Sequence, residues 1–262
     1  MIRLEEVSFG YPGKKPRDRL VPVLAGITTE LGEGNISVFL GPSGCGKTTL
    51  LNILAGITKP SGGIIDYTNY QSKSHPTGYV FQTPSLIPWR TIRENALFGA
   101  EITAKANAAT EEHCNHLLRL YGLAGFENSY PATLSVGMQQ RVSIIRAVLS
   151  GTRIILLDEP FSNSDFLMRR ELHAALSRLV SNEQLTAVMA THDIEEAVRI
   201  ADKVIVFTQR PASVRGEIEI SIPRDERINR GPSAAGMLAP YIEATEQMFA
   251  SVSNSSERGA EL

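Results

Sequence analysis

The chain has 262 residues, 42% of them apolar, which is enough for one large domain with a substantial core. Its 26 basic and 28 acidic residues give a formal net charge of -2 without long blocks of like charge, so the composition gives no indication of nucleic-acid binding. No apolar run approaches the roughly 18 residues that span a bilayer, and the two cysteines, Cys45 and Cys114, lie in neither a metal-binding nor a redox spacing.

The first part of the chain predicts strands and one helix around a glycine-rich loop. Residues 36–40 (ISVFL) form a compact apolar strand that leads directly into the loop. Residues 48–55 are apolar on most sides and are followed by Gly56, as expected for a helix that ends at a glycine. A further strand is predicted to end at residues 78–82 (GYVFQ).

The pattern becomes helical from about residue 83 to residue 150. Residues 101–121 are rich in Ala, Glu, His and Leu and predict one helix. Ser135 is a suitable N-cap for a second helix with apolar residues at spacings of four, three and four. We therefore interpret residues 83–150 as a helical subdomain inserted in an α/β core.

Strands and helices then alternate. Residues 154–158, 186–191 and 204–207 are apolar strands, and Asp193, with Glu196 three residues later, predicts a capping box. This alternation predicts a mostly parallel sheet covered on both faces.

The last part of the chain is weakly patterned. We assign residues 1–225 to one domain and residues 226–262 to a C-terminal tail, which we expect to be disordered from Ser251 onward.

Residues 41–48 (GPSGCGKT) satisfy the phosphate-loop pattern G-x-x-x-x-G-K-[ST] between a predicted strand and a predicted helix. Glycines allow backbone N–H groups to surround phosphate oxygens, and the helix dipole favours the negative charge. Lys47 would reach the β- and γ-phosphates, and Thr48 would donate its hydroxyl oxygen to Mg²⁺. The candidate phosphate-binding residues are Gly41, Pro42, Ser43, Gly44, Cys45, Gly46, Lys47, Thr48 and Thr49.

Two carboxylates follow the buried strand at residues 154–158. Asp158 at the end of this strand is a candidate partner of Mg²⁺. Glu159 alone would equally suit a helix cap or a surface acid. Between Asp158 and Pro160 it is a candidate base for the attacking water.

Residues 134–141 (LSVGMQQR) provide the third motif. Together with the other two, this segment resembles the LSGGQ signature loop of ABC ATPases, and the resemblance covers nearly the whole chain. It implies an α/β phosphate-loop NTPase core with a mostly parallel sheet, an N-terminal antiparallel β-subdomain and the inserted helical subdomain. Ser135, Gly137 and Gln139 would then contact ATP held by a second subunit. Val136 replaces the usual first glycine and would be strained if that position needs a positive φ.

Other positions match the family in the same order. Tyr11 corresponds to the aromatic residue that stacks on adenine, and Gln82 to the glutamine that meets Mg²⁺ and water. Asp165 corresponds to the D-loop aspartate, although Asn163 and Ser164 depart from the usual sequence. His192, within a T-H-D-x-x-E-A run, corresponds to the switch histidine that contacts the γ-phosphate.

The resemblance also implies partners. ATP with Mg²⁺ would be bound between two head-to-tail copies, a homodimer, which would act on transmembrane permease subunits and indirectly on an extracytoplasmic solute-binding protein, without nucleic acid. With no signal peptide in the N-terminal sequence, we expect a peripheral protein on the cytoplasmic face of a bacterial inner membrane. Residues 86–95 (LIPWRTIREN) are similar to ATPases of importers for nitrate, sulfonates and taurine. The apolar residues of this stretch would either border the permease groove or seal the helical subdomain.

Two other functions stay open on the sequence. One is a soluble ABC-type ATPase that acts on DNA or ribosomes, although such proteins usually have tandem cassettes or a long coiled coil. The other is a weakly hydrolysing nucleotide-binding regulator, for which Val136 and the altered D-loop are the only arguments.

Overall fold

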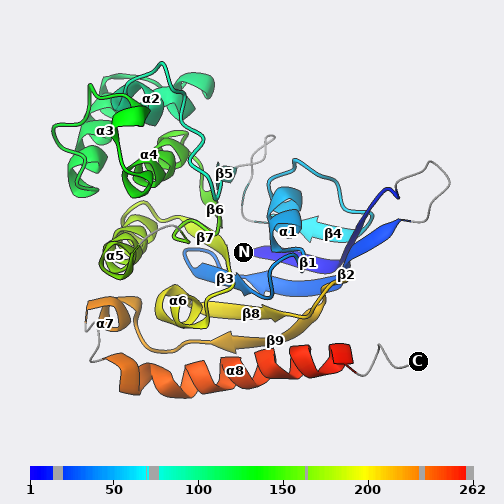
Figure 1. The fold of residues 1–262 in the computed structure, drawn as a ribbon. Coiled ribbons are helices and arrows are strands. Elements are labelled where there is room, and N and C mark those ends of the chain that lie inside the picture. The colour runs from blue at the N-terminus through cyan, green and yellow to red at the C-terminus, as the bar shows by residue number, and fades with distance from the viewer. Residues whose placement is uncertain (14–19, 69, 71–76, 163–164, 230–233, 258–262) are drawn as a thin grey trace. The chain divides into compact units, whose positions relative to one another are not determined.

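The computed structural model describes residues 1–13, 20–68, 70, 77–162, 165–229 and 234–257 (Figure 1). The chain divides into two compact units. The first contains Met1–His75 and Thr186–Leu262, and the second contains Pro76–Leu185. Each unit is described by itself below. Within the described ranges, the structure has no helix with the length and apolar character needed to cross a membrane.

The first unit has an antiparallel sheet with the strand order β2-β1-β4. It consists of β1 (Ile2–Tyr11), β2 (Val21–Leu31) and β4 (Gly62–Asp66). This is the antiparallel β-sheet expected in the N-terminal part of the chain. Its inward-facing side chains alternate with exposed ones along β1, as expected for strands with one face on a core.

The same unit contains the neighbouring strands β7-β3-β8-β9. These are β3 (Ile36–Leu40), β7 (Thr186–Thr191), β8 (Lys203–Phe207) and β9 (Val214–Glu219). Strand β3 runs parallel to β7 and β8, whereas β9 is antiparallel to β8. Every residue of β3 and β7 is buried, which explains their continuous apolar sequences. The predicted bounds of these two strands are confirmed.

The described part of the first unit has four α-helices: α1 (Lys47–Leu54), α6 (Ile194–Ile200), α7 (Arg224–Asn229) and α8 (Ala235–Glu257). Helix α8 runs along β9 in Figure 1.

The sequence predicted a weakly patterned tail that is disordered from Ser251 onward. Instead, the backbone from Ser251 to Glu257 continues α8. Packing accounts for the earlier part of α8, where Leu238 and Thr245 are buried. On β9, a Cβ at Gly216 would lie 2.8 Å from Met248 Sδ, so the glycine makes room for that side chain.

The second unit contains two parallel strands and four α-helices in its described part. The strands are β5 (Thr77–Val80) and β6 (Ile154–Asp158). The helices are α2 (Ile92–Ile102), α3 (Ala108–Leu120), α4 (Val136–Leu149) and α5 (Phe166–Asn182), with a short 3₁₀ turn, η1 (Pro131–Thr133), before α4. This unit is larger than the helical segment predicted for residues 83–150, because it also includes both strands and α5.

The single helix predicted for residues 101–121 is two helices. Helix α2 ends at Ile102, Ala104 has a φ of 55°, and α3 begins after Asn107. The Asn107 side chain accepts a hydrogen bond from the Thr110 N–H at 3.0 Å. An asparagine N-cap has therefore started a new helix within a sequence whose composition favours continuous helix.

Candidate nucleotide-binding site

The glycine-rich loop joins β3 to α1 in a conformation that side chains would disrupt. Gly44 has a φ of 77° and Gly46 a φ of 128°, outside the range that L-residues commonly adopt. A Cβ at Gly46 would lie 2.9 Å from side-chain atoms of Leu24 and Val23, and one at Gly41 would lie 2.9 Å from Cys45 Sγ. Both the backbone angles and the close packing therefore require glycine here.

Helix α1 begins without a side-chain cap. Its N-cap is Gly46, which has no side chain to accept from the N–H groups of the first turn. These groups and the helix dipole favour an anion at this end. Ser43, Gly44 and Thr48 are exposed around the start of the helix, so this end is accessible.

The Lys47 side chain lies inside the loop. It is buried, and its Nζ donates hydrogen bonds to the carbonyl oxygens of Gly41, at 2.7 Å, and Pro42, at 3.0 Å. Burial raises the pKa of the neighbouring Cys45 thiol, which keeps that thiol protonated and uncharged at neutral pH. The loop therefore presents a positive charge and backbone donors without a thiolate.

Tyr11 lies beside α1, at the end of β1. Its ring is 45% exposed, and its hydroxyl is 3.4 Å from Thr49 Oγ1. Phe9 contacts the ring edge-to-face, with 4.9 Å between the centroids. The tyrosine is thus held next to the phosphate loop with ring surface available for a flat, apolar group.

Strand pairing brings His192 to the same sheet edge as the glycine-rich loop. In the parallel pair β3–β7, Leu40 is opposite Thr191. The next residues, Gly41 and His192, therefore leave the sheet side by side at its carboxyl edge. The His192 side chain is exposed there.

The helix after His192 starts as predicted, but it is capped by a different arrangement. Asp193 Oδ1 accepts from the Glu196 N–H at 3.0 Å, which confirms the N-cap. The expected reciprocal bond of a capping box is replaced, since the Glu196 carboxylate accepts from the Thr191 hydroxyl. The Asp193 N–H also donates to Thr191 Oγ1.

The second unit repeats this parallel-edge arrangement. Val80, the last residue of β5, is opposite Leu157 on β6, so this strand ends two residues before Gln82 instead of reaching it as predicted. Gln82 beyond β5, and Asp158 and Glu159 at the end of β6, are therefore at the same edge. Asp158 is buried, whereas Gln82 is exposed and Glu159 is half-buried.

Two observations describe the environment of these carboxylates. Burial, with the neighbouring Asp158 carboxylate, raises the pKa of Tyr79. Glu159 has a φ of 44°, a left-handed conformation that is uncommon outside glycine. Ser162 stabilises this turn, because its N–H and its hydroxyl both donate to the Glu159 carbonyl oxygen.

The signature-like segment forms the start of α4. Ser135 is the N-cap, and its hydroxyl accepts from the Met138 N–H at 3.3 Å. Val136 is the first residue of the helix, is 49% exposed and has no positive φ. The condition under which Val136 would be strained is therefore not met. Asp165 is likewise the N-cap of α5, while Asn163 and Ser164 lie outside the described residues.

Comparison with known proteins now identifies the family, because the chain matches the family described as ABC transporter over residues 24–162. This chain belongs to the ABC transporter family. It is 38% identical over 209 residues to the uncharacterized ABC transporter ATP-binding protein MJ0412 of Methanocaldococcus jannaschii, covering 78% of each chain. It is 35% identical over 256 residues to the taurine import ATP-binding protein TauB of Pseudomonas fluorescens, covering 96% of this chain and 94% of the relative.

Solved structures agree with the fold. The dimeric ATP-binding cassette MJ0796 bound to ADP and Pi has a TM-score of 0.72 and 28% identity, covering 85% of this chain and all of the other. A second dimeric structure of the same bacterial cassette has a TM-score of 0.69 and 30% identity over the same shares. The predicted ABC ATPase fold is confirmed.

Two glutamines of this ABC protein have different structural roles. Gln139, expected to act across a dimer, donates from Nε2 to the carbonyl oxygens of Pro131 and Leu134, and so braces its own loop. Gln140 is buried and donates to the carbonyl oxygen of Phe81, which directly precedes Gln82. Sequence reasoning missed this connection between α4 and the Gln82 segment. The repeated glutamine of the MQQR run was its only signal.

The residues assigned to Mg²⁺ offer suitable donor atoms. Thr48, Gln82 and Asp158 provide hydroxyl, amide and carboxylate oxygens, the ligand type that Mg²⁺ prefers. In the described part of the chain no group of three or more His, Cys, Asp or Glu is arranged to hold a metal ion. A magnesium ion that is bound mainly through nucleotide phosphates needs only one or two protein ligands.

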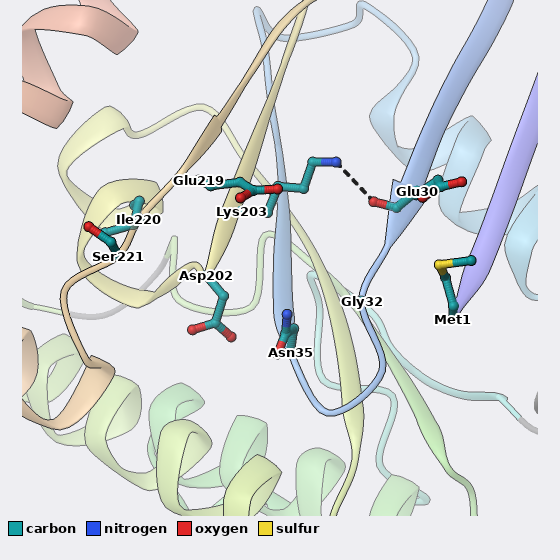
Figure 2. A pocket seen from close by; sticks show the side chains of 9 residues that line it. All are labelled: Met1, Glu30, Gly32, Asn35, Asp202, Lys203, Glu219, Ile220 and Ser221. Carbon is teal, nitrogen blue, oxygen red and sulfur yellow. Dashed lines mark hydrogen bonds between the residues drawn. The ribbon is translucent and has the colours of Figure 1, made fainter.

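A pocket in the first unit lies at the other end of the parallel strands. Its volume is about 390 Å³, and its lining includes Asn35, which precedes β3, and Asp202 and Lys203 at the start of β8. Figure 2 shows Lys203 reaching the carbonyl oxygen of Glu30, at 3.1 Å. Since Gly41 and His192 follow the carboxyl ends of β3 and β7, this pocket is separate from these two candidate nucleotide-binding residues.

Proposed function

We propose that this ABC protein binds and hydrolyses ATP, and that hydrolysis drives import of a small sulfonate-like solute through a membrane permease. The main support for ATP hydrolysis is the register of β3 and β7, because it brings the phosphate loop and His192 to one edge of the sheet. The taurine import relatives, matched over nearly their full length, support the solute class.

Binding is assigned to the first unit. Tyr11 would stack on the adenine, and the backbone N–H groups of residues 41–49 would surround the phosphates. The two carbonyl oxygens that now accept from Lys47 would keep its ammonium inside the loop, where it meets the β- and γ-phosphates. His192 would contact the γ-phosphate from the neighbouring strand end.

Water activation is assigned to the second unit. Glu159 would orient the attacking water and accept its proton, and Gln82, at the same strand edge, would position that water. The left-handed backbone at Glu159 supports this role, because such strain is often retained where a side chain must be aimed.

Mg²⁺ would be held by Thr48 and Asp158, with Gln82 as a further oxygen donor. The ion would neutralise the charge that develops on the phosphate oxygens.

A second copy of the chain is the proposed partner in hydrolysis. The hydroxyl of Ser135 and the backbone at Gly137 would contact the ATP of the other copy in a head-to-tail homodimer, with Asp165 in the crossing D-loop. The dimeric cassettes among the structural relatives support this arrangement. Gln139 would act indirectly, by holding the loop that carries Ser135.

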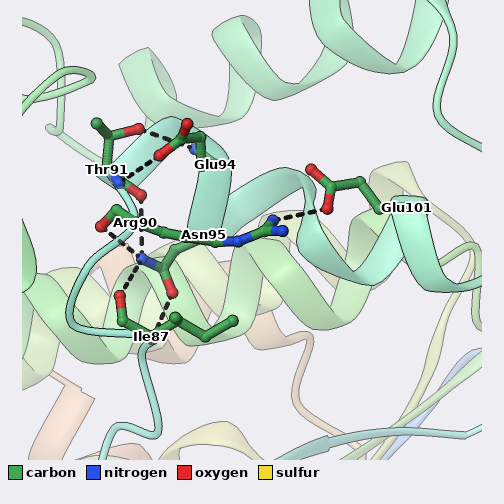
Figure 3. A network of polar contacts seen from close by, with 6 residues as sticks. All are labelled: Ile87, Arg90, Thr91, Glu94, Asn95 and Glu101. Atoms are coloured by element: carbon green, nitrogen blue, oxygen red, sulfur yellow. Dashed lines mark hydrogen bonds and ion pairs between the residues drawn. The ribbon is translucent and has the colours of Figure 1, made fainter.

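The segment before α2 is the proposed contact with the permease. Trp89 is 78% exposed. The fully buried Asn95 holds the backbone on both sides of it, at Ile87 and at Arg90, as Figure 3 shows. The Asn95 amide donates to the carbonyl oxygens of Ile87, Arg90 and Thr91 and accepts from the Ile87 N–H.

The position of Trp89 within its unit supports this contact. An exposed tryptophan on a braced segment is a typical anchor for a partner helix. Trp89 lies seven residues after Gln82, so the proposed permease contact and the proposed catalytic glutamine belong to one short segment of the chain. The ATPase would then act as a peripheral subunit at the cytoplasmic face of the membrane.

Substitution of Glu159 tests the enzymatic role. Glu159→Gln keeps the size of the side chain but removes the base, so we expect turnover to fall at least about a hundredfold while ATP is still bound. The measurements are phosphate release and nucleotide binding, with Glu243→Gln on the exposed side of α8 as control. Phosphate release by Glu159→Gln at the wild-type rate would exclude the assigned role.

The transport role is tested in the native membrane. A tagged chain, purified in mild detergent, should bring a multi-span permease in stoichiometric amount, identified by mass spectrometry. In the reconstituted complex, sulfonates offered with their binding protein should stimulate hydrolysis. Recovery of the chain without any membrane protein would instead favour a soluble ATPase.

A further inference from the structure

Three residues around His192 form a closed set of hydrogen bonds. The Thr191 hydroxyl donates to Glu196 Oε2 at 2.5 Å and accepts from the Asp193 N–H at 3.1 Å. Asp193 Oδ1 in turn accepts from the Glu196 N–H at 3.0 Å. His192 therefore lies in a turn between Thr191 and Asp193, and the Thr191 hydroxyl holds this turn by bonding both Asp193 and Glu196.

This turn is anchored at the level of the phosphate loop. Thr191 is the last residue of β7 and lies opposite Leu40, directly before Gly41. Its side chain is only 2% exposed, so the hydroxyl has a fixed environment. A rotation of that hydroxyl would release the Asp193 N–H and change the backbone at His192.

Glu196 is buried, which is uncommon for a glutamate. Burial of a carboxylate is costly unless hydrogen bonds and favourable charges compensate for it. The Thr191 hydroxyl provides one such bond, and the start of α6 provides the positive end of a helix dipole. Because Asp193 is already the N-cap of α6, the Glu196 side chain stabilises the turn at His192 rather than the start of the helix.

We propose that Thr191 and Glu196 are positioning residues for His192, holding its backbone so that the imidazole meets the γ-phosphate. This inference rests on the proposed role of His192 in hydrolysis. It assigns neither residue a contact with ATP. The two residues act together, since one hydroxyl joins them.

The test compares variants of the full-length chain in ATP hydrolysis and ATP binding. Thr191→Val removes the hydroxyl at constant shape, Glu196→Leu removes the acceptor, and Thr191→Ser keeps the hydroxyl. Small displacements of catalytic groups lower turnover by up to about a hundredfold. We therefore expect kcat to fall about tenfold or more in the first two variants, with KM for ATP unchanged within about twofold, and Thr191→Ser to remain close to wild type.

Thr245→Val is the matched control. Thr245 is a fully buried threonine of the same unit whose hydroxyl donates to the Tyr241 carbonyl oxygen at 2.6 Å within α8. The control should lower the melting temperature about as much as Thr191→Val while leaving kcat unchanged. If both threonine variants lower kcat equally, the effect is general destabilisation and the proposal is wrong.

The double variant and His192→Ala separate the remaining outcomes. If the hydrogen bond is the cause, Thr191→Val combined with Glu196→Leu should reduce kcat no more than either change alone. If the losses of kcat multiply in the double variant, the two residues act independently and the proposal that they act together is wrong. If His192→Ala leaves turnover unchanged, the proposed role of His192 fails. If it lowers turnover but the Thr191 and Glu196 variants do not, only the positioning role fails.

Discussion

Two loops of this ABC protein lead into helices, and their helix starts are built differently. The glycine-rich loop ends in α1, whose N-cap Gly46 has no side-chain hydrogen bond. The signature-like loop ends in α4, whose N-cap Ser135 accepts from a backbone N–H of the first turn. The N-cap of the first helix supplies no side-chain acceptor, whereas the N-cap of the second satisfies one donor from within the chain.

Steric tolerance separates the two loops as well. A Cβ at Gly46 would approach neighbouring side chains to 2.9 Å, but a Cβ at Gly137 would lie 3.6 Å from Met168 Cγ, an ordinary contact. Val136, in place of a family glycine, adopts the helical backbone of α4 without a positive φ. The glycine-rich loop is thus constrained by packing at Gly46, while the capped start of α4 accepts side chains in place of glycine.

Gly46→Ala should have the largest effect. The alanine would combine a strained backbone, costing about 1–3 kcal/mol, with contacts at 2.9 Å. We expect ATP affinity to fall at least about tenfold through distortion of the phosphate loop. Nucleotide titration and thermal unfolding measure the two effects.

Gly44→Ala is the control for that comparison. Gly44 also has a positive φ, but a Cβ there would meet nothing within 4 Å. The control should therefore lose less affinity than Gly46→Ala. Equal losses would mean that backbone strain, and not close packing, restricts this loop.

Ser135→Ala should have an intermediate effect. Loss of an N-cap side chain costs about 1 kcal/mol of stability, and hydrolysis should fall as well if the hydroxyl contacts the second copy. Denaturant unfolding and ATPase assays test both parts. Ser135→Thr keeps a capping hydroxyl and should restore stability. If it does not, the stability lost in Ser135→Ala is not due to the N-cap hydrogen bond.

Val136→Gly should have the smallest effect. Glycine in a helix lowers stability by roughly 0.5–1 kcal/mol, and activity should not decrease, because the backbone at this position is already helical. The ATPase rate of the purified protein is the measurement. A large loss of activity would indicate that the partner copy specifically accommodates the valine side chain.

The sequence predicted most of the candidate nucleotide-binding residues because each belongs to a short, ordered pattern. Residues 41–48, with their strand and helix context, could be read without any tertiary information, as could the N-caps at Ser135 and Asp193. The break between α2 and α3 was missed, since composition outweighed the single cap at Asn107. Helix α8 was missed because burial against β9, rather than pattern, stabilises it.

The amino-acid sequence by itself determined the family and predicted the phosphate loop and the paired carboxylates, since those depend on residue type and spacing along the chain. Tertiary structure decided which strand ends are neighbours, and thus that His192 is beside Gly41. It also decided that the Glu196 carboxylate accepts from Thr191 instead of completing a capping box. Register and the direction of a buried side chain depend on partners distant in sequence, and a local pattern does not specify these.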